Sequence, residues 1–154
     1  MVSNVIRLQR EDFDIGIEWA SLRALLGGRA GAMAAFCGVV RDQFDDAAIR
    51  ALALEHYPGM TERSMEKIVE QAAARWPLDD VVVIHRVGTL NAAAQIVFVQ
   101  VGSRHRDAAF AGASFIMDYL KTDAVFWKRE ERANSSNWIQ STSDDRKRRG
   151  DWDK

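Results

Sequence analysis

The chain has 154 residues, of which 47% are hydrophobic and 28% are charged, and its formal net charge is −1. This length suits one domain with a buried core, and the composition is typical of a soluble globular protein and not of a disordered one. The small net charge excludes a global field that would draw the chain to nucleic acid or to a membrane. The longest apolar run, at 30–40, is too short to cross a bilayer, and residues 1–12 lack a secretory signal core, so we expect a cytoplasmic protein.

Apolar periodicity and turn residues divide the chain into short elements. The expected elements in chain order are a strand at 2–8, a helix at 13–26, strands at 32–40 and 49–57, a helix at 61–76, strands at 81–87 and 96–101, a helix at 106–121, and strands at 125–130 and 137–140. Thr61 is the expected N-cap of the second helix, which Pro77 stops. This order predicts a single α+β domain with a mainly antiparallel sheet.

The domain is expected to cover residues 1–142, followed by a charge-dense tail at 143–154 that we predict to be disordered. The single cysteine, Cys37, excludes an internal disulfide and a cysteine-built zinc site. It lies in an apolar run, so we expect it to be a buried packing residue.

Two lysines, Lys121 and Lys128, stand out because large apolar residues flank both of them. An ammonium near apolar walls and near a second ammonium has a lowered pKa, which makes it usable as a nucleophile or as a general acid or base. The alternative is that both are surface lysines whose aliphatic stems cover apolar neighbours.

Further cations lie at the ends of predicted elements, where scaffolds present functional groups. They are Arg41 after the third element, His56 near the end of a strand, and Arg104, His105 and Arg106 at a strand-to-helix junction. All of these cations except His56 could converge with the two lysines on one phosphate or carboxylate ligand. For His56 we favour a structural role, and Arg41 could instead form an exposed ion pair with Asp42. No acidic pair or histidine cluster indicates a metal, and no cofactor is expected.

Several segments together resemble one family. They are FCGVVRD (36–42), LEHYPGMTE (54–62), WPLDDVVVIHRVG (76–88), SRHRDAAF (103–110) and FIMDYLKTDAVFWKRE (115–130). In this order and spacing they resemble the catalytic (large) subunit family of molybdopterin synthase, MoaE, over residues 36–138. The resemblance implies an α/β-hammerhead fold.

The resemblance also implies an activity and partners. Family members transfer sulfur from the thiocarboxylated C-terminal Gly-Gly of a ubiquitin-like small subunit to cyclic pyranopterin monophosphate (precursor Z), which creates the dithiolene of molybdopterin. They form a homodimer within a heterotetramer. Carried over residue by residue, the resemblance makes Lys121 and Lys128 catalytic. The substrate-binding positions that it implies are Phe36, Arg41, His105, Arg106 and Met117.

The chain departs from the family pattern at two places. Residues 91–95 (NAAAQ) lack the glycine and acidic residue that usually form this turn, which puts the turn's geometry in question. Thr142 stands where family members often have an arginine that reaches the other protomer's pocket; Arg146, Arg148 or Arg149 are candidate replacements. Two rival functions are a non-catalytic scaffold that binds a ubiquitin-like partner, and an unrelated enzyme that forms a Schiff base through a lysine.

Overall fold

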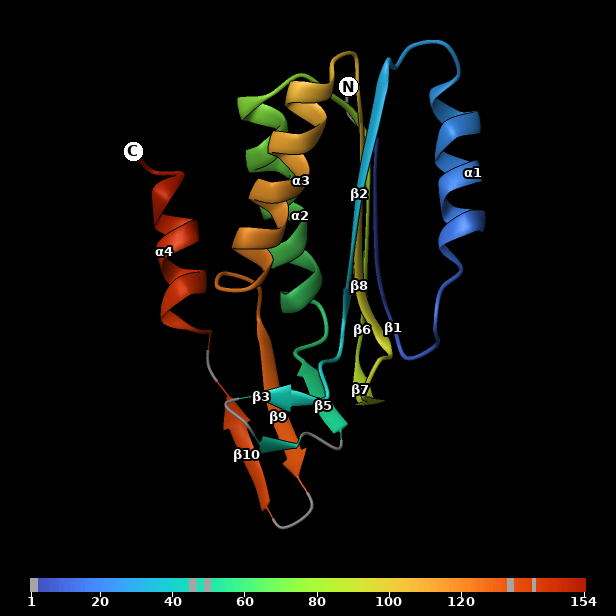
Figure 1. Cartoon of the computed structure of the whole chain (residues 1–154). Helices are drawn as coiled ribbons and strands as arrows, with labels where there is room; N and C mark the ends of the chain where they lie inside the picture. Colours follow the sequence, from blue (N-terminus) through green and yellow to red (C-terminus); the bar gives the residue numbers. More distant parts are fainter. Residues whose placement is uncertain (1–2, 45–46, 49–50, 133–134, 140) are drawn as a thin grey trace.

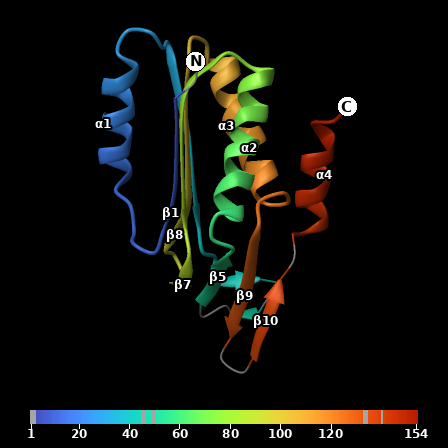
Figure 2. The same cartoon turned by 180° about the vertical axis from the view of Figure 1, so that it is seen from behind.

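The computed structural model describes residues 3–44, 47–48, 51–132, 135–139 and 141–154. Its larger sheet has the strand order β1 (Ser3–Gln9), β6 (Leu78–Arg86), β8 (Gln95–Ser103) and β2 (Ala32–Val39). Helix α1 (Ile15–Leu26) covers one face of this sheet, and helices α2 (Met60–Arg75) and α3 (Arg106–Leu120) cover the other (Figures 1 and 2). The first sheet is therefore the centre of a three-layer arrangement.

A second sheet lies at one end of the first, below α2 and α3 in Figure 1. Its order is β10 (Ser135–Ile139), β9 (Phe126–Arg132), β5 (Ala51–His56) and β7 (Gly88–Asn91), and every neighbouring pair is antiparallel. The short strands β3 (Gln43–Phe44) and β4 (Ala47–Ala48) pair with each other. Helix α4 (Ser143–Asp151) packs along α3 on the side away from the first sheet.

Side-chain alternation in the central strands explains the layers, because successive strand residues face opposite sides of a sheet. Val83 and Val99 are fully buried on the side of α2 and α3, whereas Ile84 and Phe98 are buried on the side of α1. Both faces of β6 and β8 are thus apolar, which is why their sequences read as continuous apolar runs.

The predicted α+β class and the mainly antiparallel pairing are confirmed. Two features differ from the expectation. Strands β1 and β6 are parallel, and the strands divide between two main sheets. Strand β7 lies between the strands expected at 81–87 and 96–101, where no strand was expected, and it pairs with β5. Of the expected strands, residues 2, 49–50 and 140 lie outside the described part of the chain.

The prediction that Thr61 caps α2 is wrong. The N-cap is Gly59, whose φ of 84° lies in the left-handed region that glycine adopts without strain. Thr61 is fully buried, and its hydroxyl accepts a hydrogen bond from the Tyr57 N–H at 2.9 Å and donates one to the carbonyl of Val125. Its hydroxyl therefore joins the end of β5 to the segment that enters β9.

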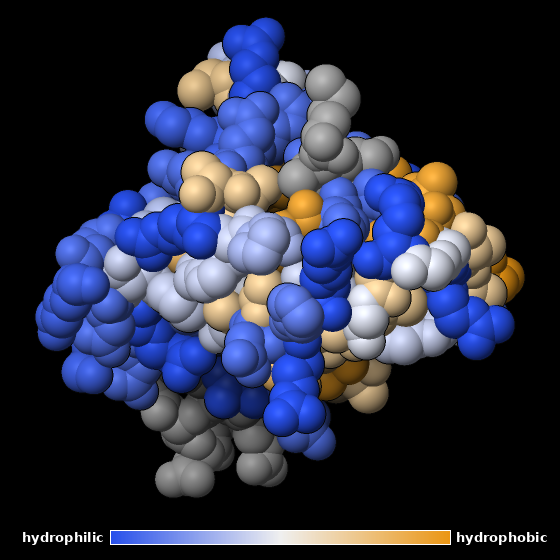
Figure 3. Space-filling model, turned by 90° about the horizontal axis from the view of Figure 1, so that it is seen from above, coloured by the Kyte–Doolittle hydropathy of each residue, from blue (hydrophilic) through white to orange (hydrophobic). Residues whose placement is uncertain are grey.

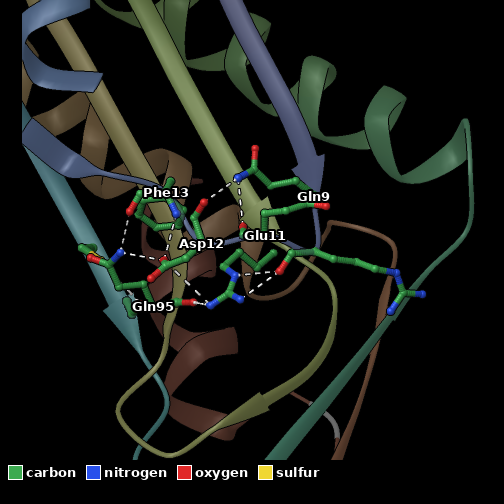
Figure 4. A network of polar contacts seen from close by, with 9 residues as sticks. Gln9, Glu11, Asp12, Phe13 and Gln95 are labelled. Atoms are coloured by element: carbon green, nitrogen blue, oxygen red, sulfur yellow. Dashed lines mark hydrogen bonds and ion pairs between the residues drawn. The ribbon is translucent and has the colours of Figure 1, made fainter. Parts of the chain in front are cut away.

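The unusual turn at 91–95 forms without glycine. Ala93 takes its left-handed position, with φ of 70°, and its N–H donates to the carbonyl of Val40 at 2.8 Å. At its end, the Gln95 side-chain amide donates to Asp12 Oδ1 at 2.8 Å and to the Phe13 carbonyl at 2.9 Å (Figure 4). These bonds hold the turn against the segment that precedes α1, and they settle the question that the sequence raised.

A helix occupies residues that we expected to be disordered. Helix α4 is capped by Thr142, whose hydroxyl accepts from the Asp145 N–H at 3.1 Å. Its far end is held by Trp152, whose ring packs edge-on against Trp76 and Phe115. One large aromatic contact thus anchors a segment that is almost free of aliphatic residues.

The surface is uneven in character. Viewed from above, hydrophilic residues dominate the side of α4, and apolar residues gather on the side of α1 (Figure 3). On α1, Ile17 and Leu25 are 64% and 56% exposed. In the part of the chain that the structure describes, no helix is long and apolar enough to cross a membrane.

Candidate functional site

A pocket of about 490 Å³ lies where α3 ends, α4 begins and the β9–β10 hairpin meets them. Its lining combines aromatic side chains with three cations. The lining residues are Leu120, Lys121, Thr122, Ala124, Phe126, Trp127, Lys128, Trp138, Ser141 and Arg146. We call this the lysine pocket. It unites the two lysines that the sequence singles out.

Lys128 enters the pocket from the middle of β9. It lies opposite Leu54 of β5, so the two side chains share a face of the sheet, and Leu54 is 1% exposed. Burial lowers the pKa of the Lys128 ammonium, and the charge of Lys121 lowers it further, while Asp145 acts in the opposite sense. The predicted combination of apolar walls and a second ammonium is therefore present at Lys128.

Lys121 is the C-cap of α3 and directly follows the last residue of the helix, Leu120. A cation is stabilised there by the helix dipole. Its side chain is 47% exposed, and its Nζ lies 3.6 Å from Asp145 Oδ1 at the start of α4. An ion pair this exposed contributes at most about 1 kcal/mol. The pairing therefore leaves Lys121 accessible to a ligand.

His85 lies behind the pocket and is a residue that the sequence analysis did not select. Its ring stacks on Phe126 with centroids 4.1 Å apart, and its Nδ1 lies 2.8 Å from the Arg86 carbonyl. Burial lowers the pKa of His85 to about 4, and the nearby charge of Lys128 contributes in the same direction. A neutral ring therefore supports the pocket wall at pH 7. The only sequence signal was a histidine at the end of an apolar strand.

The other end of α3 carries the second cationic group. Gly31, Arg104, His105, Arg106 and Asp107 line a separate hollow of about 430 Å³, and all of them are exposed. We call this the basic end. Helix α3 has 15 residues. At 1.5 Å per residue it separates the basic end from Lys121 by roughly 20 Å. Within one chain, the cations therefore do not converge on one ligand as expected.

The remaining predicted residues also lie outside the lysine pocket. Phe36 is 44% exposed on β2, and Arg41 is exposed beyond the end of that strand. Met117 is partly buried one turn before Lys121, where it packs against the apolar core between the first sheet and helices α2 and α3. His56, for which we favoured a structural role, is partly buried at the end of β5, beside another hollow.

Cys37 lies away from both cationic groups. It is partly buried and packs against the apolar core between α1 and the first sheet, with its Sγ 3.6 Å from Gln95 Oε1. Burial raises the pKa of the thiol. The thiol is therefore poorly suited to act as a nucleophile.

The fold and the site define a class of protein: an α+β domain with a lysine-lined pocket at the end of a helix. The family model described as MoaE protein matches residues 8–123. A molybdopterin synthase catalytic subunit from Ralstonia nicotianae is 49% identical over 149 residues, covering 96% of this chain and 83% of that protein. The chain belongs to the MoaE family.

Two further comparisons agree. A molybdopterin synthase catalytic subunit from Vibrio cholerae is 47% identical over 148 residues, which cover 96% of this chain and 97% of that protein. The solved structure of a molybdopterin biosynthesis MoaE protein from Burkholderia ambifaria has a TM-score of 0.83 and 45% identity, covering 98% of this chain and 99% of that one. Similarity at these levels extends over nearly the whole chain.

Proposed function

We propose that this chain is the catalytic subunit of a molybdopterin synthase and acts as a sulfurtransferase. In this reaction a ubiquitin-like small subunit threads its C-terminal Gly-Gly thiocarboxylate into the lysine pocket. Its sulfur is transferred to cyclic pyranopterin monophosphate, and two such transfers form the dithiolene. The observation that carries the proposal is the pairing of Lys121 with the partly buried Lys128 between aromatic walls. The relatives' name, catalytic subunit, accords with a partner subunit.

The two lysines have different environments and therefore different roles. We assign Lys121 as the general acid or base, or as a transient acceptor of the acyl group, because its side chain is accessible and it lies at the C-terminal end of α3. Lys128 stabilises negative charge on the thiocarboxylate and on the transition state. The thiocarboxylate sulfur displaces an oxygen substituent from a substrate carbon. Water then cleaves the acyl–sulfur bond, which leaves the sulfur on the substrate and a carboxylate on the small subunit.

The aromatic lining suits a narrow, extended peptide. Phe126, Trp127 and Trp138 supply apolar walls, and Trp127 and Trp138 are 47% and 56% exposed. Two terminal glycines fit such walls because they carry no side chains, and the terminal anion then meets the lysines. We expect removal of the small subunit's terminal glycines to abolish turnover.

The basic end belongs to the substrate site only if a second copy of the chain supplies it. The length of α3 keeps His105 and Arg106 roughly 20 Å from Lys121 of the same chain. In a homodimer, these side chains of one protomer can reach the pocket of the other and hold the cyclic phosphate, together with Arg41. Phe36 and Met117 contribute apolar contacts to the pterin in this proposal.

Mixing two variants tests this arrangement. Lys121→Ala and Arg106→Ala should each be weakly active at low substrate concentration. Random exchange makes half of the dimers mixed, and each mixed dimer has one intact site, so about a quarter of the wild-type activity should return. No recovery, in dimers shown by mass spectrometry to be mixed, would place both residues in one chain's site or remove Arg106 from the site.

The decisive assay is conversion of cyclic pyranopterin monophosphate to molybdopterin by this chain and a thiocarboxylated small subunit. A scaffold would bind the partner without turnover, and the presence of both Lys121 and Lys128 in one pocket argues against that role. A Schiff-base enzyme would be trapped by borohydride with a keto substrate. The cytoplasmic location expected from the sequence stays a prediction.

A further inference from the structure

Helix α4 carries four consecutive basic residues that differ in what they contact. Arg148 Nε donates to Asp118 Oδ1 at 3.0 Å, and Arg149 donates to both carboxylate oxygens of Asp123. Lys147 lies 3.4 Å from Asp151, one turn further along. Arg146 donates to the Ser141 carbonyl, and among the described residues no carboxylate contacts its guanidinium. Three of these cations hold the helix or its end in place, and one does not.

The orientation of α4 explains the difference. Asp145, Arg148, Arg149 and Trp152 follow the spacing of one helix face, and each contacts α3 or its C-terminal end. Trp152 Nε1 donates to Asp118 Oδ2 at 2.7 Å, and Asp118 is only 7% exposed, so this face is fixed against α3. Arg146 lies beside this face in the first turn, where it lines the lysine pocket.

The charges of the pocket lining favour an anion at this position. Asp145 lies 3.6 Å from Lys121 and also acts on Lys128, but among the described residues the lining contains three cations and no acidic residue. Lys128 enters from β9 and Arg146 enters from α4, so the two cations come from different walls. A guanidinium presents several donors in a plane and suits the oxygens of a phosphate ester.

We propose that Arg146 binds the phosphate of the substrate in the lysine pocket of its own chain, as a residue of the substrate site. The proposal rests on the proposed function for the identity of the substrate. It also assigns α4 a role, because the contacts of Arg148, Arg149 and Trp152 then serve to position Arg146 at the pocket.

Kinetics of Arg146→Gln test the proposal, with Lys147→Gln as the matched control. The control removes the same charge one residue further along α4, outside the pocket lining. Arg146→Gln should raise KM for the cyclic phosphate about tenfold or more, with kcat within about twofold, as expected for losing a hydrogen bond to a charged group. Arg146→Lys should recover part of the loss. An unchanged KM in Arg146→Gln, or an equal rise in Lys147→Gln, overturns the assignment.

Binding of inorganic phosphate separates this proposal from the proposed function. It needs no small subunit and no turnover, and isothermal titration calorimetry measures it. Weaker binding in Arg146→Gln alone supports Arg146 even if the wild-type chain proves inactive in sulfur transfer. Equal phosphate affinity in wild type and Arg146→Gln overturns the assignment whatever the turnover.

Discussion

The two ends of α3 carry cations in opposite settings. At its C-terminal end, Lys121 and Lys128 share a pocket with aromatic walls, and burial lowers the pKa of Lys128. At its N-terminal end, His105 and Arg106 are exposed around an open hollow. The first setting changes the chemistry of an ammonium, whereas the second only presents charge. This difference is the basis for proposing bond making in the lysine pocket and a contribution of the basic end to anion binding.

The helix dipole strengthens this contrast. Lys121 stands at the C-terminal end, where a cation is stabilised, and Arg106 is the first residue of the helix, where a cation is destabilised. Structural needs alone therefore account for the position of Lys121 but not for that of Arg106. A cation at an unfavourable position is consistent with the binding role that we propose for Arg106.

The largest expected effect is on turnover. Lys121→Ala should lower kcat about 10²–10⁴-fold, the usual contribution of a general acid or base, with a much smaller change in KM. Lys121→Arg should not restore activity, because a guanidinium cannot lose its proton at usable pH. Lys128→Arg should restore part of what Lys128→Ala loses, since charge is the requirement there.

Single-turnover sulfur transfer from a thiocarboxylated small subunit measures these effects, with folding checked by circular dichroism. Lys147→Gln, which removes a lysine charge outside the pocket, is the control. Substantial activity in a well-folded Lys121→Arg protein would sink the bond-making role and leave Lys121 as an anion anchor.

The next effect is on stability at acid pH, through the wall behind the pocket. His85 has a pKa of about 4 in the folded chain, against 6.5 for an ordinary histidine. Between these values the unfolded chain binds the extra proton, so the free energy of unfolding falls as pH falls, by about 3 kcal/mol in total. His85→Leu should flatten this dependence in urea unfolding between pH 7 and 4. A slope equal to that of wild type would contradict the buried, neutral ring.

A further effect on stability concerns Lys128. Because its pKa is lowered in the folded chain, the charged lysine destabilises the fold at neutral pH, and this cost disappears as pH approaches the ordinary value of 10.5. Lys128→Met should therefore raise the free energy of unfolding at pH 7, and the gain should shrink toward pH 10.5. A loss of stability at pH 7 would contradict the unfavourable burial of the charged ammonium.

The sequence could predict the fold wherever apolar periodicity was strong. Helix α2 has Met65, Ile68, Val69 and Ala72 on its buried face, and both faces of β6 are apolar. Strand β7 was missed because its four residues, GTLN, follow a valine and resemble a turn. Helix α4 was missed because it has no apolar stripe. One aromatic residue, Trp152, and several ion pairs fix it against the rest of the chain instead.

The candidate site was predictable in part. Flanking apolar residues indicated the setting of Lys128, and the family pattern made Arg146 one of three candidate tail arginines. No local pattern indicated that Asp145 would pair with Lys121, or that Arg146 would line the lysine pocket of its own chain. Within one chain, the expected convergence of all cations on one ligand does not occur, and the length of α3 alone explains this. Fifteen residues of α3 place its two ends roughly 20 Å apart.

The smallest expected effect tests the contrast between the ends of α3 directly. Arg106→Ala should leave the fold intact and raise the free energy of unfolding by about 0.3–1 kcal/mol, because it removes a cation from a helix N-terminus. Arg23 lies in the last turn of α1, where a cation is favourable, so Arg23→Ala should lower stability by a similar amount. Urea unfolding of both variants at low ionic strength measures the difference, and added salt should reduce it. A loss of stability in Arg106→Ala would identify a structural ion pair and would remove the main reason to assign the basic end to binding.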